Sequence, residues 1–478
     1  MTKIYSNSLQ PRVYPRDQHP ISRAAISDNA LRVLYRLRDA GFRSCLVGGG
    51  VRDLLLGREP KDFDVVTDAH PEDVRRLFRN CRLIGRRFRL AHVRYGKEII
   101  EVATFRAPAD TEHLTEGQIE LSDDGRILRD NSYGTIEQDA WRRDFTVNAL
   151  YYDIADFSVI DFTNGIKDLH DGILRLIGDD PAQRLREDPV RMLRAVRFAA
   201  KLGLRIAPEV DQAILQHAHL LADVAPARLF DEVLKIFHSG SALACLDELE
   251  RLGLFGVMFP QTVDCFADPE QGATRRAFLV EALRNTDARI QDDLTVHPAF
   301  LYAALLWSPV QSQAHQRITE DGEPAFNAWQ KAGGDILDRQ ARHVVIPRRY
   351  TVVVREIWDL QYRLLNSRGV RAPRLLNHPR FRAAYDFLCL RARVGDVEAE
   401  HCTWWTEYQD SDTAKQQLKR LQRLLKPSRH STRTSADRDD DDGMFDDLDS
   451  GEAAWEIDED ERPAVRGGRR RRHARPLT

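Results

Sequence analysis

The sequence predicts an α+β protein with three parts: an N-terminal α/β head, a long all-helical body and a disordered, charged tail. Helix and strand signals alternate over roughly the first 180 residues, which is typical of an α/β domain. From about residue 184 to residue 426 the strand signals fade, and apolar residues recur with helical periods. The end of the chain consists of blocks of like charge, which are usually solvated and disordered.

Each element of the head has a start or stop signal in the sequence. Residues 1–22 are polar and contain several prolines, so we expect a flexible lead. Ser27 is suited to cap an amphipathic helix, and Gly41 would end that helix. The elements expected after it are a strand at 45–47, a helix at 51–56, a strand at 62–66, a helix at 70–78, and strands at 89–95 and 98–106.

The composition of the 478 residues, 42% hydrophobic and 30% charged, is that of a soluble protein with a large core. No apolar run approaches the ~18 residues that a membrane helix needs, and the N-terminus lacks the apolar stretch of a secretory signal. The six cysteines form no CxxC pair, which argues against a zinc or redox site and favours a reduced compartment. We therefore expect a cytoplasmic protein without a membrane segment.

The net charge of −3 conceals a strong asymmetry along the chain. Residues 437–461 carry a charge of −13, residues 462–478 carry +7, and residues 1–436 carry +3. The basic end predicts an arginine arm for a polyanion, which the acidic block could mask. A solvated segment without a role in activity is the alternative.

The first chemical motif combines three glycines with two aspartates. Gly48, Gly49 and Gly50 lie between a predicted strand and a predicted helix, where a bare backbone can approach an anion closely. Asp62 and Asp64 are two residues apart in a predicted strand, so their carboxylates point to the same face. Such a pair is suited to Mg²⁺, which binds carboxylates together with substrate phosphates. Alone the aspartates could line a solvated strand edge, but beside the glycines they predict a triphosphate and metal site.

Two further motifs are rich in arginine. Residues 142–150 begin with two arginines and an aspartate, which could form an ordinary surface ion-pair cluster. Residues 186–204 place Asp188, Arg191 and Arg194 three residues apart near a helix start, and therefore on one face. An Asp beside an Arg offers an acceptor and a donor to a base edge, while further arginines can hold phosphates. An exposed, salt-bridged helix is the alternative.

The motifs occur in an order that resembles the class II nucleotidyltransferases of the DNA polymerase β-like superfamily, which include bacterial poly(A) polymerases and tRNA CCA-adding enzymes. The resemblance covers about residues 20 to 240, and residues 83–93 and 131–137 resemble the poly(A) polymerase branch. Together with the composition and the element patterns, it divides the chain into a flexible lead (1–22), a nucleotidyltransferase head with a mixed sheet (23–180), a helical nucleotide-recognition neck (181–260), a helical RNA-binding body (261–426) and the disordered charged tail (427–478).

The resemblance also implies a reaction, the transfer of AMP from ATP to an RNA 3′ hydroxyl with release of pyrophosphate. Asp62 and Asp64 would bind two Mg²⁺ ions, which activate the hydroxyl and neutralise the leaving group. Glu101, on a neighbouring predicted strand, and Asp144 compete as the third catalytic carboxylate. The implied nucleotide-binding residues are Gly49 and Arg52 at the triphosphate, Arg143 at the ribose or phosphates, Asp188 and Arg191 at the adenine, and Arg194 as a phosphate or structural partner.

The expected partners are ATP, RNA 3′ ends bound largely without sequence specificity, and RNA-decay proteins. A tRNA CCA-adding nucleotidyltransferase is the nearest alternative, because it shares the head and its chemistry and differs in its product. The basic segment 86–93 favours poly(A) addition. A catalytically silent RNA-binding protein would lack an aspartate or the Asp188 and Arg191 pair, and all of these are present.

Overall fold

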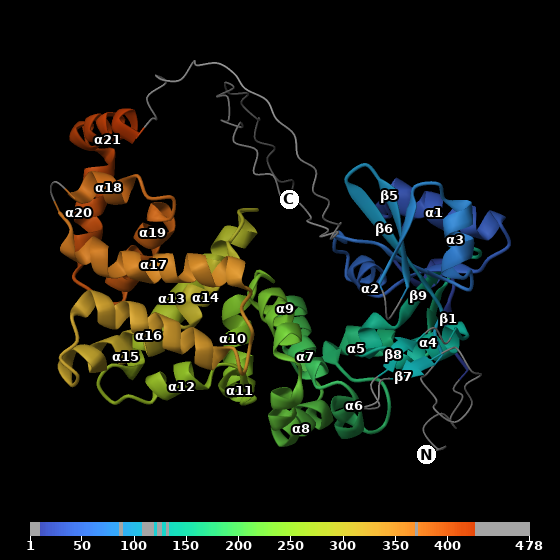
Figure 1. The fold of residues 1–478 in the computed structure, drawn as a ribbon. Coiled ribbons are helices and arrows are strands. Elements are labelled where there is room, and N and C mark those ends of the chain that lie inside the picture. Colours follow the sequence, from blue (N-terminus) through green and yellow to red (C-terminus); the bar gives the residue numbers. More distant parts are fainter. Residues whose placement is uncertain are drawn as a thin grey trace, which may run out of the picture. The chain divides into compact units, whose positions relative to one another are not determined.

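The computed structural model of the chain describes residues 10–85, 89–107, 119–121, 127–130, 133–368 and 371–425 (Figure 1). The basic residues 86–88 and the charged tail, residues 427–478, lie outside the described residues. What the sequence predicts for these two segments therefore stays a prediction.

The head is built on one eight-stranded sheet with the strand order β1–β10–β9–β2–β3–β6–β5–β4. Its neighbouring strands are antiparallel except for β3 and β6, which run parallel. The sheet is therefore mixed, as predicted. Its strands are β1 (Arg12–Tyr14), β2 (Ser44–Val47), β3 (Asp64–Thr67), β4 (Cys81–Ile84), β5 (Leu90–Tyr95), β6 (Glu98–Thr104), β9 (Leu150–Asp153) and β10 (Val159–Asp161). A separate hairpin pairs β7 (Ile119–Leu121) with β8 (Ile127–Asp130).

The lead differs from its prediction where the structure describes it. Strand β1 lies within residues 10–22 and forms the edge of the sheet, with Val13 opposite Ile160 of β10. Ile21 is only 1% exposed and belongs to the core of the head. Strand pairing and the burial of Ile21 hold this part of the lead in place. The prediction of a flexible lead was wrong here because it relied on the prolines and polar residues of the segment.

Helices cover both faces of the sheet. On one face, α1 (Asp28–Asp39) packs together with α2 (Gly49–Leu55) and α3 (Pro71–Leu77) over a core that is continuous with the sheet. Ser27 caps α1 as predicted, because its Oγ accepts a hydrogen bond of 3.1 Å from the Ala30 N–H. On the other face, α4 (Ile136–Arg142) covers a smaller apolar cluster.

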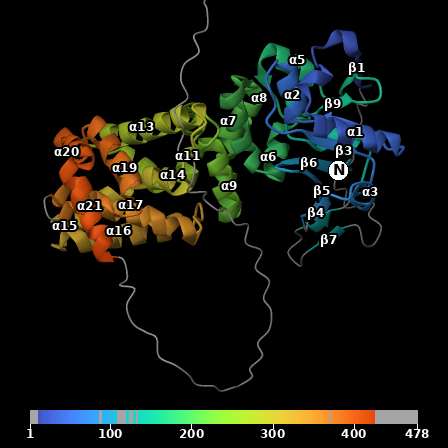
Figure 2. The same ribbon diagram turned by 90° about the horizontal axis from the view of Figure 1, so that it is seen from above.

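The described residues 165–368 and 371–425 are mainly helical, as predicted, and their strands are β11 (Ile173–Leu174) and β12 (Arg205–Ile206), a short parallel pair. One hydrophobic cluster runs without interruption from Phe145 in the head to Leu390 near the end of the body. Helices α16 and α17 pack side by side in both views (Figure 1 and Figure 2). The helices are α5 (Gly165–Asp171), α6 (Pro181–Glu187), α7 (Val190–Leu202), α8 (Pro208–His217), α9 (Pro226–Phe237), α10 (Ala242–Arg251), α11 (Leu254–Met258), α12 (Pro260–Phe266), α13 (Gly272–Gln291), α14 (Pro298–Leu305), α15 (Trp307–Thr319), α16 (Ala325–Gln340), α17 (Arg348–Asn366), α18 (Ala372–Leu376), α19 (Phe381–Arg393), α20 (Ala399–Asp410) and α21 (Asp412–Leu425).

One disulfide bond, between Cys389 and Cys402, joins α19 to α20. The sequence analysis did not predict this bond, because the two cysteines are 13 residues apart and match no spacing motif. Trp405 of α20 is 1% exposed and lies in a local apolar cluster of the last helices. Among the described residues, no helix combines the length and the apolar character needed to cross a membrane.

Candidate active site

A glycine turn between β2 and α2 forms one wall of the site. Gly48 has φ +73°, a conformation that side chains rarely adopt, and it directly precedes α2. A Cβ atom at Gly48 would lie 3.7 Å from Nη1 of Arg143 and 3.9 Å from Oδ2 of Asp64. A Cβ at Gly50 would lie 3.3 Å from the main-chain oxygen of Asp62. The turn therefore brings the backbone close to both predicted aspartates.

The structure corrects two boundaries at this turn. Helix α2 begins at Gly49, two residues earlier than predicted, so Gly48 alone makes the turn. The N–H of Gly49 belongs to the first turn of the helix, where main-chain donors have no partner within the helix. Strand β3 begins at Asp64, not at Asp62. The predicted starts of α2 and β3 are wrong by two residues because glycine and aspartate occur both in loops and at the first positions of helices and strands.

Three carboxylates gather at the start of β3. Asp62 and Asp64 are exposed and Phe63 is 8% exposed in the core, so the two carboxylates share a face as predicted. Glu101 lies directly beside Asp64, because the parallel pairing of β3 with β6 makes these two residues partners. His92 of β5 places its Nε2 3.4 Å from a carboxylate oxygen of Glu101.

The acidic cluster is electrostatically strained. Although the Asp64 side chain is partly open to solvent, its pKa is raised to about 6, first because neighbouring protein removes part of the water from the carboxylate and second because Glu101 and Asp62 repel its charge. Arg143 opposes this shift. Within the described part of the chain no three His, Cys, Asp or Glu side chains already form a complete metal-binding group. Mutually repelling carboxylates that leave room for phosphate oxygens match the preference of Mg²⁺.

Arg143 is fixed by a buried network that the sequence analysis missed. Its Nε and Nη2 each donate to Oδ2 of Asp139 at 3.0 Å, and Nε also lies 3.0 Å from the hydroxyl oxygen of Tyr151. The Tyr151 hydroxyl in turn donates to the same carboxylate oxygen at 2.8 Å. The network holds the guanidinium so that Nη1 faces Gly48 and Asp64. Asp139 lies in the first turn of α4 and Arg143, four residues later, caps the end of this helix, a spacing that could have suggested the pair.

Asp139 is therefore a positioning residue for Arg143. For the reaction that the resemblance implies, we expect Asp139→Asn to lower kcat/KM for ATP by about ten- to a hundredfold, because an amide cannot orient the guanidinium through two charge-assisted bonds. Steady-state kinetics on the folded fraction measure this loss. Tyr151→Phe is the matched control: it removes one hydroxyl but leaves the ion pair, and should cost less than tenfold. Wild-type kinetics for Asp139→Asn would contradict the positioning role.

Asp144 is held by an arginine of the neck. Its Oδ2 accepts bonds of 2.7 and 2.5 Å from Nε and Nη2 of Arg194 on α7, and its Oδ1 accepts 2.8 Å from the Phe145 N–H. Burial by itself would raise the pKa of Asp144, but the charge and hydrogen bonds of Arg194 outweigh it and lower the pKa. The geometry thus links Asp144 to Arg194, and places Glu101, not Asp144, beside Asp64.

Arg52 is 4% exposed and firmly anchored. It donates to Oδ1 of Asp53 from Nε at 2.9 Å and from Nη2 at 2.8 Å, and to Oδ1 of Asn148 at 2.5 Å. Its Nη2 lies 3.5 Å from where a Cβ of Gly49 would be. The guanidinium therefore lines the underside of the glycine turn. That Arg52 and Gly49 bind a triphosphate stays a prediction, and the anchors Asp53 and Asn148 were not predicted.

The predicted base-reading residues do not form one helical face. Asp188 precedes α7, whose cap is Pro189, and it accepts 2.8 Å from Nη2 of Arg228 on α9. Arg191 turns back toward α6, where its Nη1 donates to the main-chain oxygen of Arg184 at 2.6 Å and to Glu187 at 3.0 Å. Near the start of α7, Asp188 and Arg191 thus bind different partners, and Arg194 binds Asp144 of the head.

Known protein families and solved structures resemble this chain in sequence and in fold. The family profile "Poly A polymerase head domain" matches residues 44–175. The profiles "Probable RNA and SrmB- binding site of polymerase A" and "Polymerase A arginine-rich C-terminus" match residues 203–265 and 321–439. Among solved structures, one titled "tRNA-processing enzyme (apo form I)" has a TM-score of 0.55 at 20% identity and covers 84% of this chain and 97% of its own. That likeness concerns the fold alone.

Sequence relatives are much closer. Poly(A) polymerase I of Salmonella typhi is 50% identical over 401 residues, which cover 84% of this chain and 86% of the relative. Poly(A) polymerase I of Haemophilus influenzae is 46% identical over 428 residues, covering 88% and 94%. The CCA-adding enzyme of Lactobacillus helveticus is 37% identical over 213 residues, which cover 43% of this chain and 49% of that enzyme.

The fold and the acidic cluster beside the glycine turn are those of an RNA nucleotidyltransferase. Within that class, the chain belongs to the poly(A) polymerase I family. The CCA-adding enzymes are distant relatives, so the alternative of a CCA-adding enzyme is not favoured.

Proposed function

We propose that this chain is a template-independent poly(A) polymerase that transfers AMP from ATP to RNA 3′ ends and releases pyrophosphate. Its membership of the poly(A) polymerase I family supports the reaction. The observation that carries the assignment to this site is the parallel pairing of β3 and β6, which sets Asp64 beside Glu101 opposite the glycine turn.

Asp62, Asp64 and Glu101 form the acidic side of the proposed site. When bound there, two Mg²⁺ ions would supply charge neutralisation and a lowered pKa for the attacking 3′ hydroxyl. The protein's contribution is to hold the carboxylates adjacent, and their mutual repulsion, which raises the pKa of Asp64, is present before substrate arrives. We propose Glu101 as the third catalytic carboxylate, and Asp144 as the group that holds Arg194.

The triphosphate would lie along the opposite wall. The Gly49 N–H at the start of α2 and the Arg52 guanidinium beneath it are fixed donors on this wall. Arg143 points its Nη1 toward Gly48 and Asp64, where it can contact a phosphate or the ribose. Because Asp139, Tyr151, Asp53 and Asn148 hold both guanidinium groups in advance, little reorganisation is needed when ATP binds.

We also propose that Asp188 and Arg191 read the adenine base. Arg191→Ala should then lower the preference for ATP over CTP, measured as the ratio of kcat/KM values, by about tenfold or more. The loss follows because a protein that recognises a base by hydrogen bonds discriminates through donors left unpaired by the wrong base. Arg186→Ala removes a more exposed arginine of the same segment and should leave the ratio unchanged. Equal selectivity of Arg191→Ala and the wild type would remove Arg191 from base recognition.

The helical body would hold the RNA through its phosphates, which predicts binding that is sensitive to salt and largely independent of sequence. The family membership supports this role for the body, and the profile match over residues 203–265 extends it to the neck. We place the enzyme in mRNA processing and RNA decay in the cytoplasm, with RNA-decay proteins as partners.

Primer extension tests the proposed function. A short unstructured RNA is incubated with the full chain and Mg²⁺, with ATP and CTP in separate tubes. A long ladder with ATP and almost no product with CTP is the expected result. Inertness on this primer, together with addition of C, C and A to a trimmed tRNA, would contradict poly(A) addition.

A further inference from the structure

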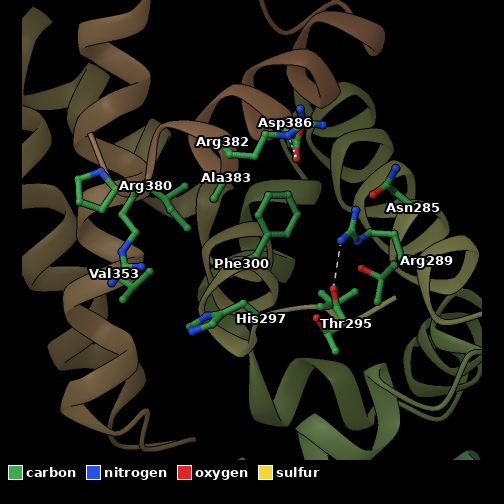
Figure 3. Close-up of a pocket in the computed structure, with 14 residues that line it drawn as sticks. Asn285, Arg289, Thr295, His297, Phe300, Val353, Arg380, Arg382, Ala383 and Asp386 are labelled. Atoms are coloured by element: carbon green, nitrogen blue, oxygen red, sulfur yellow. Dashed lines mark hydrogen bonds and ion pairs between the residues drawn. The ribbon is translucent and has the colours of Figure 1, made fainter. Parts of the chain in front are cut away.

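A cavity in the helical body lies apart from the residues of the acidic site. It encloses about 320 Å³ between α13, α14, α17 and α19 (Figure 3). This volume is at the lower end of the range for sites that take small molecules. The α13 and α14 residues that line it, such as Arg289 and Phe300, fall outside the segments matched by the three family profiles.

The cavity combines an aromatic, apolar floor with a cationic rim. Phe300 points into its centre (Figure 3), and Val353 and Ile357 of α17 are the apolar residues that this helix adds to the lining. Arg289 and Arg382 stand at the rim on opposite helices (Figure 3). A flat ring for a base and guanidinium groups for a phosphate are the chemistry that recognises a nucleoside phosphate.

The charges around the cavity favour an anion. Arg289 donates a hydrogen bond of 3.2 Å to the main-chain oxygen of Thr295. Because this oxygen belongs to a neutral group, the bond does not neutralise the positive charge of Arg289. Arg382 and Arg380 are partly neutralised by Asp386 and Glu356 at 3.1 and 3.0 Å. Because both of these pairs are exposed, phosphate oxygens can compete for them at small cost.

His297 adds a neutral donor at the cavity edge. Its Nδ1 accepts a hydrogen bond of 3.1 Å from the Ala299 N–H, so in the neutral ring the proton is on Nε2. Burial and the charge of Arg380 both lower the pKa of His297, which keeps the ring neutral at physiological pH. A neutral N–H donor suits a base or ribose oxygen.

A second hollow of about 270 Å³ adjoins the first and shares Asn285, Arg289, Arg382 and Asp386 with it. It adds Tyr385 and Arg393, an aromatic ring and another guanidinium. The same pair of chemical features is thus repeated in neighbouring hollows. Such repetition matches successive units of a strand, whereas an isolated nucleotide would need only one hollow.

We propose that the two hollows hold consecutive nucleotides of the RNA strand, upstream of its 3′ end, with one base against Phe300 and its phosphate between Arg289 and Arg382. The inference rests on the proposed function, because the strand that the enzyme extends is the nucleic acid it must hold. A free nucleotide has the same chemistry, and the experiment below separates the two sources.

The test compares RNA binding by variants of the full chain. Fluorescence anisotropy with a labelled oligo(A) 12-mer gives Kd at several salt concentrations. Arg289→Ala/Arg382→Ala should raise Kd about tenfold and reduce the slope of log Kd against log salt by about 0.7 for each lost phosphate contact. Arg371→Ala/Arg374→Ala is the matched control, since it removes two exposed arginines outside both hollows. An equal loss in both double variants would reduce the effect to net charge and overturn the proposal, as would wild-type binding by Arg289→Ala/Arg382→Ala.

Phe300→Leu tests the base contact separately. It keeps apolar volume but removes the stacking ring, so Kd should rise about fivefold with an unchanged salt slope. The Phe300 ring also packs against Phe387, with 5.8 Å between the ring centroids, so the substitution could disturb the fold. Circular dichroism melting verifies that the variant is folded. An unchanged Kd in the folded Phe300→Leu variant would overturn the stacking assignment.

Equilibrium dialysis with ATP separates the two sources of nucleotide. Two ATP sites in the wild type and one in Arg289→Ala/Arg382→Ala, with RNA binding intact, would assign the hollows to free nucleotide and overturn the strand assignment. One ATP site in both proteins, with RNA binding weakened in the variant, is the expected result. RNA binding does not require catalysis, so a chain that binds RNA through the hollows but fails to extend it would contradict the proposed function alone.

Discussion

Replacement of Asp64 by Asn should abolish AMP incorporation and at the same time stabilise the metal-free protein. We expect activity to fall by at least about a thousandfold, because an amide cannot replace a carboxylate that binds a catalytic cation. Stability should rise because the pKa of Asp64 is about 6 in the folded protein, above the ordinary range of an aspartate, so the ionised carboxylate opposes folding at neutral pH. The variant relieves the repulsion from Glu101 and Asp62.

The pH dependence of the melting temperature gives the sign of this effect. A carboxylate whose pKa is raised on folding costs nothing when it is protonated in both states; its cost grows as the pH rises from the ordinary pKa of an aspartate to the folded value, and is complete above that value. The melting temperature of Asp64→Asn should therefore exceed that of the wild type by about 2 °C or more at pH 7.5, and the difference should vanish near pH 4. Both are measured with a chelator present, and Asp39→Asn, an exposed carboxylate on α1, is the control. A variant that is less stable than the wild type at pH 7.5 would contradict the crowding of these carboxylates.

Replacing Glu101 or Asp144 by its amide should show that the first residue serves catalysis and the second serves stability. Glu101→Gln should lower kcat about a hundredfold or more without lowering the melting temperature, because Glu101 lies beside Asp64 and its neutralisation relieves the same repulsion. Asp144→Asn should instead lower the free energy of unfolding by about 3 kcal/mol, because it breaks a largely buried ion pair with Arg194. Denaturant unfolding and steady-state kinetics on both variants provide the measurements.

The stabilising effect of Asp144 should also depend on pH. Because its pKa is lowered on folding, its contribution is complete above the ordinary pKa of an aspartate and is lost as the pH falls through the folded value. The difference in stability between the wild type and Asp144→Asn should therefore shrink in acid. A folded but inactive Asp144→Asn, combined with an active Glu101→Gln, would make Asp144 the third catalytic carboxylate.

Much of the head could be predicted from its sequence because its signals are local. The cap at Ser27, the strand that leads into Gly48 and the shared face of Asp62 and Asp64 each depend on neighbouring residues, and the structure contains all three. The pairing of Asp64 with Glu101 could not be predicted, because the order of strands in a sheet depends on contacts between residues that are distant in the sequence. A spacing rule cannot supply that order.

The side-chain partners were harder to predict than the elements. Asp188, Arg191 and Arg194 have the spacing of a single helical face, but Asp188 lies before the helix and Arg194 is drawn to Asp144, 50 residues earlier in the chain. The anchors of Arg143 and Arg52 were missed for a similar reason. A buried guanidinium selects its acceptors by proximity in the fold. Asn148 lies within the motif of residues 142–150 and Tyr151 directly follows it, but neither has a spacing that marks it as an anchor.

The hydrophobic cluster that begins at Phe145 has a consequence for the order in which the protein matures during synthesis. Phe145, Val147, Leu174 and Leu176 leave the ribosome with the head, but their apolar neighbours are on α7 and later helices. A nascent chain that ends near residue 180 would expose these side chains to water. Arg194, the partner of Asp144, would also be missing from such a chain. The head can thus complete its fold only after the neck has emerged, which delays catalytic competence until the helices that follow it are in place.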